Sequence, residues 1–136
     1  MRTIAINPDN VSKPASHNYS QGIVVEGARK LVFISGQIPE DSAGIIVGPG
    51  DVEAQTRQIF KNIEAVLAAA GGNLKNIVKV TTYLADMKHF EKFDRVRSEF
   101  LSSVSPASTL VAVNPETWTR FSSEILVEID AIAALS

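Results

Sequence analysis

The sequence predicts a single α+β domain, residues 1–136, in which two helices cover one face of a mixed β-sheet. Its 136 residues are 45% hydrophobic and 21% charged, which is the size and composition of one globular core. Two segments carry apolar residues at helical spacing, and several shorter ones are rich in β-branched residues. The resulting order, β-β-β-α-β-α-β-β, has a central β-α-β-α-β whose crossovers place both helices on one side of the sheet.

The charge balance and the absent residue types argue against several classes of function. The formal net charge is -2 and no run of Lys and Arg occurs, so the chain is not built to coat a nucleic-acid backbone. There is no cysteine, and the two histidines, His17 and His89, show no metal-ligand spacing. The N-terminus lacks the apolar core of a signal peptide, and no apolar run is long enough to cross a bilayer. We expect a cytoplasmic protein with no metal site and no nucleic-acid or membrane partner.

The N-terminal third contains three short strands. The expected elements are a strand at 3–6, a polar loop at 8–18, strands at 22–25 and 31–35, and a surface loop at 39–50. The strands at 22–25 and 31–35 are expected to pair as a hairpin, turned at residues 26–29. The run 31–34 is apolar without alternation, which is typical of a strand buried on both faces.

The first helix is predicted at residues 51–70. Asp51 is a suitable N-cap, Glu53 lies in the first turn, and Gly71 and Gly72 end the helix. Its apolar stripe consists of Val52, Ile59, Ile63, Val66, Leu67 and Ala70. This stripe should face the sheet.

The second half of the chain predicts a strand, a helix and two more strands. These are a strand at 77–84, a helix that follows the candidate cap Asp86, a break at 103–107, and strands at 109–113 and 125–132. The helix has Phe90, Phe93, Val96 and Phe100 on its apolar side. In the strand 77–84, alternation places Val78, Val80, Thr82 and Leu84 on one face and Lys79, Thr81 and Tyr83 on the other.

Because side chains alternate between the two faces of a sheet, the residues of the last two strands also divide into two sets, one for each face. The more β-branched set, Thr109, Val111, Val113, Ile125, Val127 and Ile129, is expected beneath the helices. The opposite set is Ser108, Leu110, Ala112, Leu126, Glu128 and Asp130. This second face still carries apolar residues, and two helices on one side cannot cover it. Since monomers rarely expose large apolar patches, we expect a symmetric homo-oligomer.

Glu128 and Asp130 are the most informative charges, because both lie within an apolar run on the face without helices. Burial of a carboxyl group between subunits raises its pKa and suits it to act as a general acid or base. The alternative is a hydrogen bond or salt bridge between subunits, and both readings stay open for each residue.

These segments resemble the RidA family, also called YjgF or the L-PSP endoribonuclease family, over nearly the whole chain. The resemblance runs through Tyr19-Ser20-Gln21-Gly22, Ser35-Gly36-Gln37-Ile38-Pro39, Gln55-Thr56-Arg57-Gln58, Ala69-Ala70-Gly71-Gly72, Pro106-Ala107-Ser108 and Val127-Glu128-Ile129-Asp130-Ala131-Ile132-Ala133. It implies a chorismate-mutase-like fold, a homotrimer with ligand clefts between subunits, and hydrolysis of reactive imines and enamines of amino acids to keto acids and ammonia. It implies neither a metal nor an organic cofactor.

The resemblance also implies roles for individual residues. Glu128 matches the glutamate that holds or activates the attacking water and is the expected catalytic residue. The expected substrate-binding residues are Tyr19, Ser35, Gly36, Tyr83, Pro106, Ala107, Ser108 and Arg120. One departs from the pattern, because Ser108 occupies the position of an arginine that grips the substrate carboxylate in a bidentate pair. Losing that anchor should weaken binding by about ten- to a hundredfold.

A second departure is the stretch 113–124, which is several residues longer than the usual turn of the family and contains Trp118 and Arg120. Either Arg120 or Arg97 is a candidate replacement for the missing anchor. The leading hypothesis is a hydrolase or deaminase whose substrate is not a simple 2-imino acid. The alternatives are a trimeric ligand-binding or regulatory protein without catalysis and, less favoured, an endoribonuclease that inhibits translation.

Overall fold

The chain folds into a four-stranded sheet, a two-stranded ribbon and two α-helices, in the predicted order. The computed structural model describes residues 1–136. The elements are β1 (Arg2–Ile6), β2 (Gly22–Glu26), β3 (Lys30–Gln37), α1 (Val52–Ala69), β4 (Ile77–Leu84), α2 (Phe90–Leu101), β5 (Ala107–Ala112) and β6 (Val127–Leu135). Three short 3-10 turns, η1 (Leu74–Asn76), η2 (Met87–His89) and η3 (Pro115–Trp118), lie in the connections.

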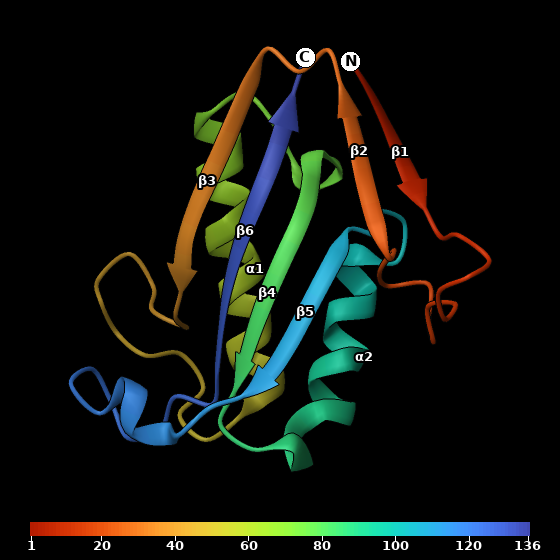
Figure 1. The fold of residues 1–136 in the computed structure, drawn as a ribbon. Helices are drawn as coiled ribbons and strands as arrows, with labels where there is room; N and C mark the ends of the chain where they lie inside the picture. The colour runs from red at the N-terminus through yellow and green to blue at the C-terminus, as the bar shows by residue number, and fades with distance from the viewer.

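The main sheet has the strand order β3-β6-β4-β5, so the last strand of the chain lies inside the sheet (Figure 1). β6 is antiparallel to both of its neighbours, β3 and β4, whereas β4 and β5 are parallel. Parallel neighbours need a long crossover, which α2 and its flanking turns supply. The predicted mixed sheet is confirmed, with β5 at one edge and β3 at the other.

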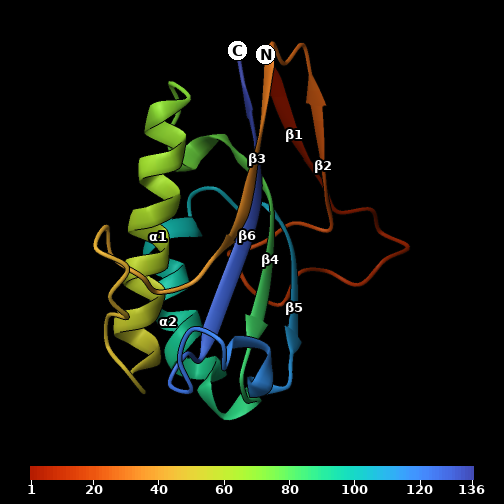
Figure 2. The same cartoon turned by 90° about the vertical axis from the view of Figure 1, so that its left-hand side faces the viewer.

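Both helices lie on the same face of this sheet, as the sequence predicts (Figure 2). Between helices and sheet lies one core of 16 buried hydrophobic residues. α1 contributes Ile59 and Leu67 to this core, and α2 contributes Phe93. The rings of Phe60 and Phe100 stack with their centroids 4.6 Å apart and join the two helices.

The ends of α1 confirm the predicted caps. The carboxylate of Asp51 accepts two hydrogen bonds from backbone N–H groups of the first turn. At the other end Gly71 has a φ of +87°, the left-handed conformation that favours glycine. Within the predicted stripe, Val66 is 38% exposed, because the stacking of Phe60 on α2 turns the buried face of α1 away from it. Neither helix combines the length and the hydropathy that a membrane span requires.

The predicted pairing of the second and third strands is wrong. β2 pairs antiparallel with β1, and β3 pairs with β6. The eight residues of β3 pair along the nine-residue β6, whereas β2 has only five residues and matches the five of β1. The β1–β2 ribbon lies beyond the β5 edge and is joined to it by a single bridge between Ser20 and Ala107 (Figure 1).

The predicted orientation of β5 is also wrong. Ser108 lies opposite Val80 and Leu110 lies opposite Thr82, so Ser108 and Leu110 share the face that the helices cover. Val111 lies on the other face and is 43% exposed. Because β5 is an edge strand, neither of its faces is fully covered, and its β-branched residues do not mark the buried side.

The face turned away from the helices, which we call the open face, is bare in a single chain (Figure 2). Leu31 and Phe33 of β3 point to it and are 57% and 72% exposed, so β3 is not buried on both faces within one chain. On β6 the predicted orientation is correct, since Glu128 and Asp130 lie on the open face between buried neighbours.

Gln55 joins three segments that meet near the start of α1. Its side chain is completely buried. Nε2 of Gln55 donates to the carbonyls of Gly48, at 3.0 Å, and of Glu124, at 2.7 Å. Its Oε1 accepts a hydrogen bond from the N–H of Leu126 at 2.8 Å. This one amide therefore ties the loop before α1 to the residues that lead into β6.

The substitution Gln55→Leu should lower the free energy of unfolding by about 2–3 kcal/mol, because the N–H of Leu126 would be buried without a partner. Urea unfolding followed by circular dichroism measures the change. Lys61→Leu, on the exposed side of the same helix, is the matched control and should alter the free energy by no more than about 0.5 kcal/mol. Equal effects of the two substitutions would contradict the role of Gln55.

Candidate functional site

Apart from Arg120, the residues predicted to form a site fall into two groups that one chain does not bring together. The open-face group consists of Ser35, Gly36, Tyr83 and Glu128, and the edge group consists of Tyr19, Pro106, Ala107 and Ser108 at the outer edge of β5, where Ser20 bridges to Ala107. Across the sheet Glu128 is level with Tyr83 and, through it, with Val111. Ser108 lies three residues further along β5 and on the opposite face, so Glu128 and Ser108 do not share a site within one chain.

Glu128 lies directly against Gly36 at a β-bulge. Regular pairing of β3 with β6 is interrupted there, so that Ser35 and Gly36 together face only Asp130. A Cβ at position 36 would lie 2.9 Å from Cδ and 3.0 Å from Oε2 of Glu128, so any other residue there would push the carboxylate out of this position. Only glycine lets this carboxylate lie on the backbone of β3. Bulges are frequent beside active sites, where they redirect side chains.

A row of polar side chains continues from Glu128 across the open face. The hydroxyl of Tyr83 donates to Oδ2 of Asp130 at 3.0 Å, and this hydrogen bond is the main cause that raises the pKa of Tyr83. Nζ of Lys79 donates to Oγ1 of Thr109 at 2.8 Å. Burial lowers the pKa of Lys79, and the charge of Asp130 opposes that shift.

The two carboxylates of the open face therefore differ in the hydrogen bonds that they accept. Asp130 accepts a hydrogen bond within its own chain. Glu128 receives no hydrogen bond and no ion pair from another side chain, although it is half-buried. Of the pair, Glu128 is the one free to act on a bound molecule.

The edge group borders a pocket between β5, α2 and the loop before β2, which we call the edge pocket. Its lining is Ala15, Tyr19, Phe90, Arg97, Ser108 and Leu110. The loop is held in place by Ser20, whose N–H donates to the carbonyl of Pro106 at 2.9 Å and whose hydroxyl donates to the carbonyl of Ser105 at 2.6 Å. Tyr19 and Ser108 thus line the pocket, whereas Pro106 and Ala107 support the loop through their backbone.

Arg97 is the charged group of the edge pocket. Its side chain is only 7% exposed. Nε and Nη2 donate to Oδ1 of Asp94 at 3.0 and 2.5 Å. The guanidinium carbon lies 5.9 Å from the centre of the Phe90 ring and 5.3 Å from that of Phe93. Of the two arginines that the sequence offers as replacements for the missing anchor, Arg97 is the one beside Ser108.

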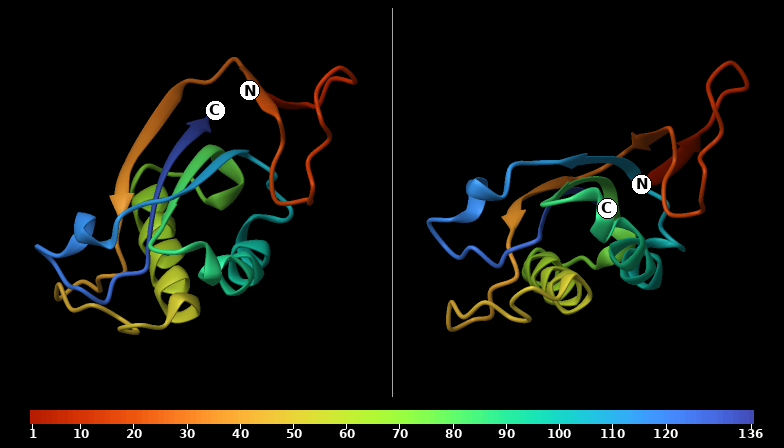
Figure 3. Two further views of the ribbon diagram at one scale, coloured as in Figure 1. Left: turned by 60° about the horizontal axis from the view of Figure 1, so that its bottom comes forward. Right: turned by 90° about the horizontal axis from the view of Figure 1, so that it is seen from below.

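Arg120 lies elsewhere. It belongs to the long connection between β5 and β6, which projects from one end of the sheet (Figure 3). Its guanidinium stacks on the ring of Phe121, 4.7 Å from the centroid. Phe121 lines a separate groove with Gly36 and Asn62. Trp118 of the same connection is 1% exposed, so it packs inside the fold and does not reach the mouth of a cleft.

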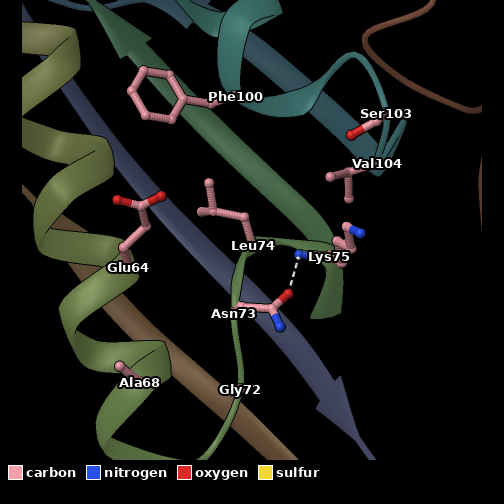
Figure 4. A pocket seen from close by; sticks show the side chains of 9 residues that line it. All are labelled: Glu64, Ala68, Gly72, Asn73, Leu74, Lys75, Phe100, Ser103 and Val104. Atoms are coloured by element: carbon pink, nitrogen blue, oxygen red, sulfur yellow. Dashed lines mark hydrogen bonds between the residues drawn. The ribbon is translucent and has the colours of Figure 1, made fainter.

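Another pocket lies between the C-terminal parts of the two helices, away from both groups (Figure 4). Phe100, Leu74 and Val104 supply its apolar surface. The carboxylate of Glu64 and the amine of Lys75 lie on opposite sides of it in Figure 4. Asn73 is occupied in capping η1, where its side chain accepts from the N–H of Lys75 at 3.0 Å. Because its polar groups do not converge, this pocket lacks the usual character of a ligand site.

Two residues that hold Arg97 in place, Asp94 and Asn18, were not predicted from the sequence. Asn18 is 4% exposed, and its Nδ2 donates to Oδ1 of Asp94 at 3.1 Å and to Oγ of Ser98 at 2.8 Å. The i, i+3 spacing of Asp94 and Arg97 is a readable signal for a pair on one helix. The contact from Asn18 to α2 joins residues 76 positions apart and has no local signal.

Comparison with known proteins gives a consistent picture. The model of the family described as Endoribonuclease L-PSP matches residues 10–135. A RutC family protein of Pyrococcus horikoshii is 41% identical over 125 residues, which is 92% of each chain. Protein DfrA of Myxococcus xanthus is 39% identical over 129 residues, which is 95% of this chain and 93% of DfrA.

Solved structures agree with these relatives. YyfB of Yersinia pestis, a protein of unknown function of the Rid family, has a TM-score of 0.83 and 25% identity, with 99% of this chain and 100% of that chain covered. A putative endoribonuclease of Thermotoga maritima has a TM-score of 0.68 and 33% identity, with 100% and 99% covered.

The substitution Asp130→Ala should lower the pKa of Tyr83 towards its ordinary value of about 10, because both the hydrogen bond and the nearby negative charge are removed. Phenolate absorbance during a pH titration measures it, and Tyr83→Phe identifies which transition belongs to Tyr83. Since the folded-state pKa is raised, the stabilisation from this pair is present below pH about 10 and is lost as pH rises through the folded-state pKa. An unchanged transition in Asp130→Ala would show that the bond is absent.

Proposed function

Because the chain belongs to the endoribonuclease L-PSP family, together with RutC and Rid proteins, we propose that it is a hydrolase that releases ammonia from a small imine or enamine. The observation that carries this proposal is the carboxylate of Glu128. It lies on Gly36 at a β-bulge and receives no hydrogen bond from another side chain. A carboxylate in that position can accept a proton from a water molecule.

The proposed reaction uses this carboxylate and one water molecule. Glu128 takes a proton from the water while the oxygen attacks the carbon of the C=N bond, and then gives that proton to the nitrogen. The resulting carbinolamine transfers its hydroxyl proton to the nitrogen as the C–N bond breaks, so that ammonia leaves and a C=O group remains. Backbone N–H groups near Ser35, Gly36 and Ser108 are suited to stabilise the charge that develops.

The complete cleft, in this proposal, forms between two copies of the chain. One chain holds the open-face group and the edge group on different faces. A neighbour that places its β5 edge against the open face would bring Tyr19 and Ser108 towards Glu128. The exposure of Leu31 and Phe33 supports such a contact, because an apolar area of this kind is normally covered. A homotrimer, which the family resemblance implies, would contain three such clefts.

The identity of residue 108 limits the substrate. A serine at this position offers a hydroxyl and no charge, so it cannot form the bidentate pair that holds a carboxylate next to the reacting carbon. We therefore propose a substrate other than a simple 2-imino acid. A ligand-binding protein without catalysis would show the same Ser108, and the name of the family and of several relatives keeps RNA cleavage as a third possibility.

The substitution Phe33→Glu should dissociate the oligomer, because it places a charge in the apolar area that a neighbour would cover. Size-exclusion chromatography with light scattering measures the mass. Met87→Glu is the matched control, since Met87 is 49% exposed in η2 and lies off the open face. An unchanged mass for Phe33→Glu would show that the open face is not the interface.

Imine hydrolysis should depend on Glu128 and should improve with an arginine at position 108. Imines of alanine and of other amino acids are generated in the assay by an amino-acid oxidase, with semicarbazide as the competing trap. Glu128→Gln should lower the rate by about a hundredfold or more. On the imine of alanine, which has no second acid group, Ser108→Arg should gain about ten- to a hundredfold over the wild type.

Each other result has a distinct meaning. Full activity of Glu128→Gln would remove Glu128 from the reaction. Equal activity of the wild type and Ser108→Arg on the imine of alanine would disprove the proposed substrate limit. Binding of imines or keto acids without turnover by any variant would identify a ligand-binding protein. Cleavage of RNA by a nuclease-free preparation, lost in Glu128→Gln, would favour the endoribonuclease.

A further inference from the structure

We infer that Arg97 binds an acid group of the substrate and that this group lies at a distance from the reacting carbon. The inference rests on the proposed function, because it names a part of the substrate that the same cleft would hold. In this inference, Arg97 on helix α2 binds the negative charge of the substrate, because Ser108 on strand β5 carries no charge that could bind it.

The first support is a set of hydrogen-bond donors that the chain leaves unused. A guanidinium group has five N–H donors and stays charged at any pH that a folded protein meets. Arg97 uses its Nε and Nη2 for Asp94, while its Nη1 donates to no group of the chain. Yet the side chain is only 7% exposed. The buried side-chain atoms without a partner are Thr82 Oγ1 and Trp118 Nε1, so Nη1 of Arg97 is accessible, and the edge pocket, which Arg97 lines, is where a ligand can reach it.

The second support is that the guanidinium is held in a fixed orientation. Asp94 fixes one edge of it, and Asn18 in turn holds Asp94 through a hydrogen bond of 3.1 Å. The rings of Phe90 and Phe93 lie within 6 Å of its carbon and contribute cation–π attraction. A donor group that is already oriented binds a planar carboxylate without paying further side-chain entropy.

The third support concerns the position of the acid group. Ser108 and Arg97 line the same pocket, but Ser108 belongs to the sheet and Arg97 to the helix layer behind it. In the proposed packing, the open face of a neighbouring copy, which carries its Glu128, lies against the β5 edge. In that packing, Ser108 on the edge strand would lie nearer to the reacting carbon than Arg97 in the helix layer. A carboxylate attached directly to that carbon does not reach Arg97, whereas one at the far end of a short chain does.

A purely structural role for Arg97 is the competing explanation, since its pair with Asp94 joins successive turns of α2. The two roles differ in what they predict for binding. A structural arginine changes the stability of the protein and affects all ligands alike. An arginine that binds the substrate discriminates between a ligand with a distal acid and the same ligand with a distal ester.

The test compares 2-oxoglutarate, which has a distal carboxylate, with its 5-methyl ester, in which the distal group is neutral, by titration calorimetry on the full-length protein. The wild type should bind the diacid about ten- to a hundredfold more tightly. Arg97→Gln should abolish this preference, and Arg97→Lys should restore part of it. Arg95→Gln is the control and should keep it, because Arg95 is exposed and pairs with Glu53 on the surface.

Two further variants complete the design. Ser108→Asp keeps Arg97 but gives it a carboxylate within the pocket, so it should also lose the preference, even if Arg97→Gln fails to fold. Glu128→Gln should keep the preference while losing turnover, which separates a failure of this inference from a failure of the proposed function. Equal affinities for the two ligands in the wild type, or a preference that persists in Arg97→Gln or Ser108→Asp, would overturn the inference.

Discussion

A four-stranded sheet with helices on only one of its faces must find another cover for the second face. In this chain, the need to cover the second face determines on which face the polar side chains of the candidate site lie. The covered face is filled by the apolar core, so it has no room for charged groups apart from its rim. Glu128, Asp130, Tyr83 and Lys79 all lie on the open face, and Arg97 lies at the rim, where α2 meets the edge strand. The polar groups thus occupy the regions that a neighbouring copy would enclose in the proposed assembly, in which association would both bury apolar area and complete the cleft.

Much of the fold follows from local patterns in the sequence. α1 is marked by its N-cap, its apolar stripe and its closing glycines, and β4 by an alternation that holds from Lys79 to Leu84, so the bounds of both are predicted nearly to the residue. At the start of β4 a register shift places Ile77, and not the predicted Val78, in the core. The errors arise where partners are distant in sequence. β3 pairs with β6 about 100 residues later in the chain, and no turn signal reveals a partner at that separation. The face of β5 is ambiguous because an edge strand is only partly covered on either side.

The residues of the candidate site can be predicted from the sequence only where they belong to a recognisable family motif. The resemblance identifies Glu128, Tyr19 and Gly36, and the structure adds the reason for the glycine, since any Cβ there would collide with the glutamate. Neither the composition nor the motif indicates which arginine approaches Ser108. That depends on the angle of α2 and on Asn18, whose contact with Asp94 exists only in the folded chain. The arginine is absent from β5 and another arginine is present on the neighbouring α2. A comparison of sequences position by position does not reveal such a replacement.

The buried amide of Gln55 also bears on how this chain can vary over evolutionary time. It fixes the exit of the long connection at Glu124 and Leu126, and the burial of Trp118 fixes a point upstream. Between these two points, closure entropy rises by only about 0.6 kcal/mol when the loop doubles in length. Insertions and deletions there are nearly neutral for folding and leave the register of β6 unchanged. The connection can therefore diversify rapidly among descendants while the glutamate beyond it keeps its place.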